Sequence, residues 1–353
     1  MSDEAIGVEP FGPAATLYTM SNAYLRVRVV NFGGRIVSIE MRNPQGGFDH
    51  VLLGFDSLED YVEAGGSFGA LLGRNANRIA GGRFTLDGRC HELSTNEGDT
   101  TLHGGEAGFG KVFWQADASA PEALVLSHLS PDGDQGFPGD LRVRAAYRLA
   151  RDTLTLTIEA ETTKPTPVSL SAHPYFNLAG PAAGDMLDHE ITILADAFLP
   201  TDAKQIPTGE IRDVTDTPFD FRRPMPAGAR IRVPDPQILY GKGYDHYFVL
   251  GAAQDAAPRL AARARHAPSG RVLEILTTQP GTQFYTGNNL NGSVAGRGGA
   301  YRQSAGFAFE PQGFPNAVNQ PNFPTTVLRP GTKYRETIAY RLSLDEGQSA
   351  APP

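Results

Sequence analysis

The stretch FTLDGRCHEL, residues 84–93, carries the clearest local folding signal in this chain. Short runs suited to strands stand on both sides of Asp87-Gly88. This dipeptide favours a two-residue type I′ turn, because both of its residues accept positive φ. The stretch therefore predicts a β-hairpin. A second hairpin is predicted where the run Tyr24–Val30, the turn at 31–34 and the run Arg35–Met41 follow one another.

Similar runs recur along the rest of the chain. β-Branched or aromatic residues, closed by Gly, Pro or Asp, predict further strands at Leu124–Leu129, Leu141–Leu149, Leu154–Ala160, Ile191–Leu194, Arg271–Thr277 and Tyr334–Leu342. Only Ser57–Glu63 is typical of a helix, with Ser57 as its N-cap. Many short strands with almost no helical periodicity predict an all-β fold, a large antiparallel β-sandwich.

The 353 residues fit one large domain or two smaller ones. The best linker candidate, Ala252–Pro258, is only an Ala-rich loop between strands, and no internal repeat is present. We therefore expect a single domain over residues 1–353, with a core of about 16–343. The segments 131–140 and 286–300 are so rich in Gly, Asp and Asn that we expect rim loops there rather than strands.

Composition and charge exclude several classes of protein. No apolar stretch reaches the roughly 18 residues of a membrane span, so we expect no membrane partner. The net charge of −8 and the lack of long Lys or Arg runs argue against nucleic acid as a partner. The N-terminus lacks the pattern of a secretory signal, which predicts a cytoplasmic protein. The lone Cys90 cannot form an internal disulfide or a structural zinc site.

A few polar residues stand in settings that suit chemistry. His103 lies in a polar Gly-rich loop, and His173 precedes Pro174 and two aromatic residues. Glu310 ends an apolar strand, where partial desolvation would raise its pKa and make it a usable base. Asp245 lies between aromatic residues, and Arg78 could bind ligand oxygens. Structural roles, such as a satisfied core histidine, a turn or a salt bridge, remain equally open for these residues at this point.

Other kinds of chemistry lack their motifs. The Gly-rich phosphate loops, the GxSxG nucleophile elbow and HExxH are absent. Asp188-His189-Glu190 is a weak metal candidate, because adjacent residues of a strand point to opposite faces. Metal-free acid/base work by His with Glu or Asp remains. The surrounding aromatics, Arg, Asn and Gln are typical of a sugar-binding cleft.

Several separated motifs resemble the aldose 1-epimerases, also called galactose mutarotases. They occur in order over roughly residues 16–343: GRNANRIAGGRF (73–84), NEG (96–98), LHGG (102–105), HPYFNL (173–178), YDH (244–246), QFYTGN (283–288), EPQ (310–312) and PNAVNQPNFP (315–324). Each motif alone is weak. Their order and number make a chance match improbable.

The resemblance implies a galactose mutarotase-like β-sandwich. It also implies an isomerase that interconverts the α and β anomers of free aldohexoses such as glucose and galactose, without a metal or cofactor. In that family the residues matching His173 and Glu310 act as general acid and general base. The positions that match sugar contacts are Asn77, Arg78, His103, Tyr175, Asp245 and Gln283. Gln279 is a second possibility for the glutamine contact.

Two other functions stay open from the sequence. A hexose-6-phosphate 1-epimerase on the same fold would need cations for a phosphate dianion, and Arg142, Arg144, Arg222 and Arg223 are available. A non-catalytic sugar-binding module would keep the aromatics and Arg78 but would not need both His173 and Glu310. We expect a free aldose as the partner of the protein, and a monomer or a homodimer.

Overall fold

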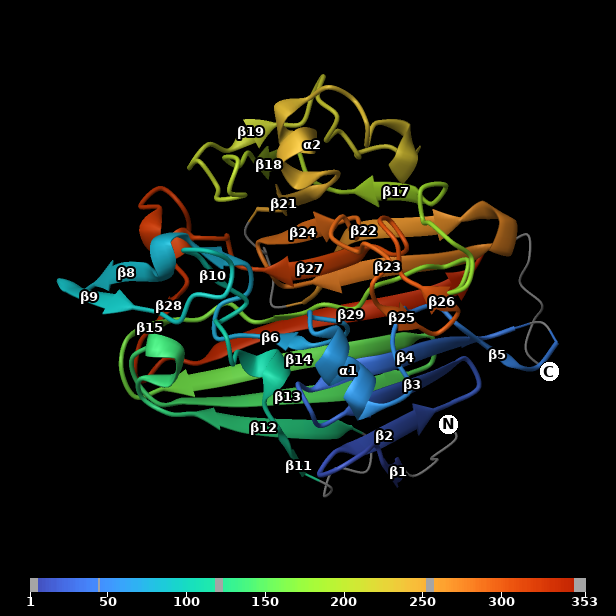
Figure 1. The fold of residues 1–353 in the computed structure, drawn as a ribbon, viewed down its shortest axis with the longest axis horizontal. Coiled ribbons are helices and arrows are strands. Elements are labelled where there is room, and N and C mark those ends of the chain that lie inside the picture. The colour runs from blue at the N-terminus through green and yellow to red at the C-terminus, as the bar shows by residue number, and fades with distance from the viewer. Residues whose placement is uncertain (1–5, 44, 118–122, 252–256, 346–353) are drawn as a thin grey trace.

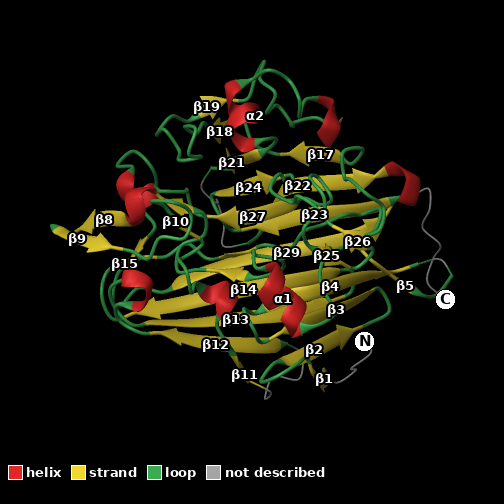
Figure 2. Cartoon of the chain, in the orientation of Figure 1, coloured by secondary structure: helices red, strands yellow, loops and turns green. Residues whose placement is uncertain are grey.

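The structure, a computed structural model, describes residues 6–43, 45–117, 123–251 and 257–345. Three antiparallel sheets dominate this part of the chain (Figures 1 and 2). The first sheet has the order β1 (Gly7–Pro10), β2 (Thr16–Ser21), β3 (Leu25–Val30), β4 (Arg35–Arg42) and β5 (Phe48–His50). The predicted hairpin at 24–41 is confirmed, because β3 and β4 pair from Leu25↔Met41 to Val30↔Arg35.

The largest sheet contains nine strands. Their order is β11 (Gln115–Asp117), β12 (Leu124–Ser130), β13 (Leu141–Ala150), β14 (Thr153–Thr162), β29 (Tyr334–Leu344), β23 (Arg271–Thr277), β22 (Arg259–His266), β17 (Glu190–Ile193) and β20 (Met225–Pro226). This sheet includes all six further strands that the sequence predicted. Buried and less buried residues alternate along β14, as expected for a strand with one face on the core.

The third sheet carries most of the candidate site. Its order is β19 (Arg212–Asp213), β18 (Ala197–Leu199), β21 (Asp245–Val249), β24 (Gly281–Tyr285) and β27 (Ala308–Gln312). The large sheet lies behind the first and third sheets in Figure 1. One hydrophobic cluster joins all three, with members such as Ile39 of β4, Leu156 of β14 and Phe309 of β27. The predicted antiparallel all-β sandwich is confirmed.

Short strand pairs complete the described β-structure. They are β6 (Leu71–Leu72) with β16 (Ser171–Ala172), β7 (Arg78–Ile79) with β10 (Thr101–Leu102), β8 (Arg83–Leu86) with β9 (Arg89–Glu92), β15 (Thr166–Pro167) with β28 (Val327–Leu328), and β25 (Ala295–Gly296) with β26 (Gly299–Ala300). The hairpin β8–β9 confirms the opening prediction. Asp87 and Gly88 have φ of 49° and 76°, the positive values that a type I′ turn requires.

The predicted helix is also confirmed, as α1 (Leu58–Ala64), and Ser57 Oγ accepts a hydrogen bond from Asp60 N at 3.1 Å. The sequence analysis did not predict α2 (Pro236–Gly241), which Asp235 caps. Neither α-helix in the described ranges has the length and apolar character needed to cross a bilayer.

Two expectations about loops have different outcomes. Segment 131–140 joins β12 to β13 with one 3-10 turn at Asp134–Gly136, so it is a loop as predicted. The prediction of a loop throughout 286–300 is wrong at its end, where β25 and β26 pair. The Arg297 guanidinium holds this turn by donating to the carbonyl oxygens of Val37 and Phe55. Most of the Ala-rich loop expected at Ala252–Pro258 lies outside the described residues, at 252–256.

Candidate active site

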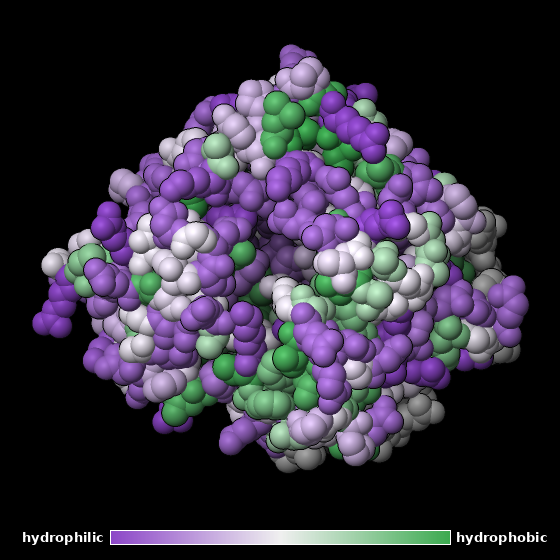
Figure 3. All heavy atoms as spheres, in the orientation of Figure 1, coloured by the Kyte–Doolittle hydropathy of each residue, from purple (hydrophilic) through white to green (hydrophobic). Residues whose placement is uncertain are grey.

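Three neighbouring strands place polar side chains on one face of the third sheet. In the register of the sheet, Asp245 of β21 lies opposite Tyr285 of β24, and Gln283 of β24 lies opposite Glu310 of β27. Because side chains alternate along a strand, these four residues share a face. Figure 3 shows the molecule hollowed in front of this region, with hydrophilic residues around the hollow.

His173 reaches the same site from the end of β16. Its backbone N donates to Ala70 O at 3.0 Å, and its carbonyl oxygen accepts from Gly69 N at 2.9 Å. The ring stacks on Tyr175 with centroids 4.6 Å apart, and Tyr175 in turn packs on Phe68 at 4.7 Å. Backbone hydrogen bonds and aromatic packing together fix the position of the imidazole.

His173 and Glu310 form a buried pair at the centre of the site. His173 Nε2 lies 3.4 Å from Glu310 Oε1, and their side chains are only 6% and 3% exposed. Burial, with the nearby charge of Asp245, raises the pKa of Glu310 well above its ordinary value. Burial, with a smaller effect of Arg35, lowers the pKa of His173 to about 4. Both shifts favour the uncharged form of each group.

His103 stands beside this pair, with its ring centroid 5.7 Å from that of His173. Its Nδ1 accepts a hydrogen bond from the backbone N of Asn77 at 3.1 Å. A neutral imidazole has one protonated nitrogen, so Nε2 carries the hydrogen and can donate to a ligand oxygen. Burial, together with the charges of His173 and Arg78, holds the pKa of His103 well below its usual range, which favours this neutral form.

The same tautomer bears on metal binding. His103, His173 and Glu310 each offer one atom within 4.8 Å of the others, the one such group of three among the described residues. A metal-binding nitrogen must provide a lone pair, but the hydrogen bond from Asn77 already occupies the lone pair of His103. The donor set therefore fits hydrogen bonding to oxygen better than it fits a transition metal.

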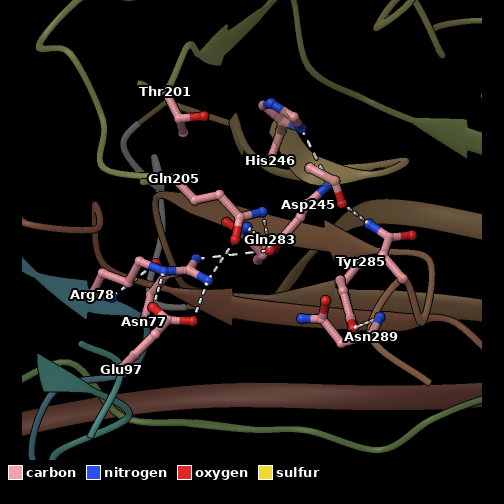
Figure 4. Close-up of polar contacts among 12 residues, drawn as sticks. Asn77, Arg78, Glu97, Thr201, Gln205, Asp245, His246, Gln283, Tyr285 and Asn289 are labelled. Carbon is pink, nitrogen blue, oxygen red and sulfur yellow. Dashed lines mark hydrogen bonds and ion pairs between the residues drawn. The ribbon is translucent and has the colours of Figure 1, made fainter. Parts of the chain in front are cut away.

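A charged network forms one side of the site (Figure 4). Arg78 donates from Nε to Glu97 Oε2 at 2.6 Å, and from Nη2 to Glu97 Oε1 at 3.0 Å and Gln205 Oε1 at 2.8 Å. Gln205 Nε2 donates to Asp245 Oδ2 at 2.9 Å, and Gln283 Nε2 donates to Asp245 Oδ1 at 2.6 Å. Burial raises the pKa of Asp245, although the Arg78 charge opposes this effect.

The network leaves several polar atoms available. Within the described ranges, the buried atoms without a hydrogen-bond partner include Gln283 Oε1, Glu310 Oε2 and His173 Nδ1. Leaving buried polar atoms unpaired costs about 1–3 kcal/mol each. These three side chains are neighbours in the site, and a polar ligand bound among them would complete their hydrogen bonding.

The structure brings together most of the residues that the sequence analysis selected. His103, His173, Tyr175 and Glu310 cluster at its centre, and Arg78, Asp245 and Gln283 form the charged side. Asn77 adjoins them through its backbone, while its Oδ1 accepts from Arg78 N at 2.8 Å. Gln279 points elsewhere, since its Nε2 donates to Tyr334 Oη at 2.8 Å and Leu170 O at 3.3 Å. Gln283 is therefore the glutamine of this cluster.

Sequence reasoning missed three members of the site. Tyr285 stands 6.0 Å from both His173 and Tyr175, measured between ring centroids. Strand alternation from Gln283 could have identified it. Glu97 was quoted only as part of a motif, without a partner. No local pattern pointed to Gln205, which lies 127 residues from Arg78 along the chain.

Comparisons with known proteins identify similar sequences and a similar fold. The profile of one family, described as Aldose 1-epimerase, matches residues 16–341. Galactose mutarotase from Bos taurus is 44% identical over 328 residues, which cover 93% of this chain and 94% of that protein. Aldose 1-epimerase from Escherichia coli (strain K12) is 36% identical over 345 residues, covering 97% and 99%. The solved structure of an aldose epimerase homologue from C. elegans has a TM-score of 0.85 and 27% identity, covering 94% of this chain and 100% of that one.

Proposed function

This chain belongs to the aldose 1-epimerase family, and we propose that it interconverts the α and β anomers of free aldohexoses with His173 as general acid and Glu310 as general base. The family predicted from the sequence motifs is confirmed, and so is the enzyme class, an isomerase of the mutarotase type. The name of the bovine relative supports galactose as one substrate.

One observation carries the assignment of roles: His173 Nε2 and Glu310 Oε1 lie 3.4 Å apart in a buried site. Opening a pyranose ring requires a base at the hydroxyl of C1 and an acid at the ring oxygen. Both oxygens are bonded to C1, so the base and the acid must be neighbours.

Before and after the reaction, the side chains of His173 and Glu310 together hold one exchangeable proton. Ionised Glu310 takes the proton of the C1 hydroxyl, protonated His173 gives its proton to the ring oxygen, and the C1–O5 bond breaks as the aldehyde forms. Rotation about C1–C2 presents the other carbonyl face. His173 then removes the proton from the C5 hydroxyl, Glu310 returns its proton to O1, and the C1–O5 bond forms again. Protons and electrons balance over the cycle.

The electrostatics of the two side chains favour the other arrangement of this proton. The pKa shifts of both groups favour protonated Glu310 beside neutral His173, which contains the same single proton. This is also the arrangement that ring opening leaves behind. We infer that the proton crosses the contact between the two side chains when a cyclic sugar binds.

The neighbouring groups suit the binding of hydroxyls. His103 Nε2–H and Arg78 Nη1 offer donors, and Gln283 Oε1 and Asp245 offer acceptors. We propose that these groups, with Tyr175 and Asn77, bind and orient the sugar. Positioned donors in a dry site also stabilise charge that develops on oxygen during the reaction.

Local charge disfavours the phosphosugar alternative. Arg78 Nε lies 2.6 Å from Glu97 and Arg78 Nη1 lies 3.7 Å from Asp245, so carboxylates already balance this cation. Arg222 pairs with Asp220 at 2.7 Å, and Arg144 lies 3.9 Å from Glu159. A phosphate dianion needs cations that are not neutralised in this way. A neutral sugar fits the site better.

The remaining expectations stay proposals. We propose that the chain folds as one domain, acts in the cytoplasm as a monomer or homodimer, and takes a free aldose as its partner, without nucleic acid or membrane. The net charge of −8 supports the absence of a polyanionic partner.

Polarimetry of freshly dissolved α-D-galactose and α-D-glucose tests the function and the role of His173. The wild-type protein should accelerate mutarotation, and His173→Asn should lower the catalysed rate by about 10²–10⁴-fold. His128→Asn is the matched control, because His128 also packs among aromatic rings but lies on β12 beside Phe109 and Trp114. A folded wild-type protein without activity on either sugar would favour a phosphosugar enzyme or a binding module. An active His173→Asn would refute the general acid.

A further inference from the structure

Gln205 bridges the two charged residues on one side of the site. Its Oε1 accepts from Arg78 Nη2 at 2.8 Å and its Nε2 donates to Asp245 Oδ2 at 2.9 Å (Figure 4). We propose that Gln205 is a positioning residue that keeps Arg78 and Asp245 apart, so that both retain hydrogen-bonding groups for the sugar. This inference rests on the proposed function, in which Arg78 and Asp245 contact the substrate.

Counting hydrogen-bond donors shows what the bridge leaves available. A guanidinium has five N–H groups, one on Nε and two on each Nη. Glu97 and Gln205 occupy the Nε–H and both hydrogens of Nη2. The two hydrogens of Nη1 remain. Asp245 Oδ2 lies 3.7 Å from Nη1, beyond the length of a hydrogen bond.

Without the Gln205 bridge, the 3.7 Å separation between Arg78 Nη1 and Asp245 Oδ2 would not persist. Arg78 and Asp245 are opposite charges with side chains only 5% and 10% exposed, so little water screens their attraction. A direct Arg–carboxylate contact has a preferred length of about 2.7–2.9 Å. Closing to that distance would occupy Nη1 and an Asp245 oxygen with each other, and both would be lost to the sugar.

The backbone around Gln205 is arranged to present its amide to this site. Gln205 has φ of 61°, in the left-handed region, and its N donates to Asp202 O at 2.9 Å. Thr201 and Pro207 pair across the base of the same loop, which connects β18 to β19. The amide therefore reaches Arg78 and Asp245 from a closed turn.

The neighbouring residue provides a matched control. Lys204 lies on the same loop and bonds Asp99 from Nζ at 2.8 Å, but both side chains are more than half exposed. Gln205→Met and Lys204→Met each replace a polar end with an unbranched thioether. Met and Gln have similar length, so the left-handed backbone and the packing of the loop are retained.

The experiment measures kcat and KM for galactose in wild type, Gln205→Met, Lys204→Met, Asp245→Asn and the double variant Gln205→Met/Asp245→Asn. Gln205→Met should raise KM about tenfold with kcat within about twofold, because uniform binding of substrate and transition state is lost. Lys204→Met should match wild type. In the Asp245→Asn background the charge that would draw Arg78 Nη1 across the site is gone, so adding Gln205→Met should change KM by less than about twofold.

Other results would overturn either the inference about Gln205 or the proposed function. An unchanged KM in Gln205→Met, or a loss confined to kcat, overturns the inference. The same tenfold rise in the Asp245→Asn background also overturns it, since Gln205 would then contact the sugar itself. An inactive wild type, or a normal KM in Asp245→Asn, instead contradicts the proposed function. If Gln205→Met does not fold, Gln205→Glu replaces it, because its carboxylate still accepts from Arg78 but cannot donate to Asp245.

Discussion

Replacing Glu310 with Gln should change activity and stability in opposite directions. Gln has the shape of Glu but cannot take the proton of the C1 hydroxyl. A positioned proton-transfer group contributes about 10²–10⁴-fold in rate, equivalent to about 3–5 kcal/mol of barrier. Polarimetry of α-D-galactose, with the spontaneous rate subtracted, should show a loss of this size.

The stability effect follows from the raised pKa of Glu310. In the unfolded chain a glutamate ionises above about pH 4.3, whereas folded Glu310 keeps its proton to a higher pH. Protonated Glu310 therefore contributes stability that is fully present below the pKa of an unfolded glutamate. This contribution to the free energy of unfolding is lost as pH rises, by up to about 1.4 kcal/mol per pH unit. Gln does not titrate. The stability of Glu310→Gln relative to wild type should rise from pH 5 to pH 7 in urea unfolding.

Glu336→Gln is a suitable control. Burial also raises the pKa of Glu336, but this residue lies on β29 and accepts a hydrogen bond from Thr278, away from the site. It should show a similar trend in stability with full activity. The reasoning would be refuted if Glu310→Gln kept more than about a tenth of the wild-type rate. A stability difference that stayed flat between pH 5 and pH 7 would refute it equally.

Four further outcomes are expected. The kcat/KM of the wild type should decline as pH falls through about 4, because a second proton then binds to the His173–Glu310 pair at His173. A decline in the polarimetric rate near pH 6.5 would contradict the lowered pKa of His173. Dialysis against EDTA should leave the rate unchanged, because the lone pair of His103 is already engaged, and activity regained on adding Zn²⁺ would speak against that tautomer. His103→Asn should lower kcat/KM by about 10²-fold through loss of one donor, with His91→Asn on the β8–β9 hairpin as its unaffected control. Trp114 lies in the hydrophobic cluster shared by the three sheets, so its fluorescence and far-UV circular dichroism should report one coincident unfolding transition; two separated transitions would argue for two domains.

Structure that depends on neighbouring residues could be predicted from the sequence. The turn at Asp87-Gly88 has the expected φ values because these two residues decide the backbone geometry themselves. The helix after Ser57 likewise follows from a cap that bonds its own first turn. Asp235-Pro236 offered a comparable start signal for α2, but six residues give too little periodicity to recognise.

Structure that depends on distant contacts could not be predicted in this way. The pair β25–β26 is held by Arg297, which bonds Val37 across 260 positions of the chain. In the site, residue chemistry alone left His173 and Glu310 with structural alternatives, and only the family resemblance selected them. The bridge of Gln205 depends on a loop that meets Arg78 in space alone.

The site residues come from two kinds of structural element, strands and a loop, which tolerate substitution to different degrees. Asp245, Gln283, Tyr285 and Glu310 stand on adjacent strands of one sheet, where a shift of one residue would turn every side chain to the opposite face. Gln205 belongs to a loop, which tolerates substitution and changes in length far better. Among related enzymes, substitutions should therefore be more frequent in the loop 200–208 than at these strand positions.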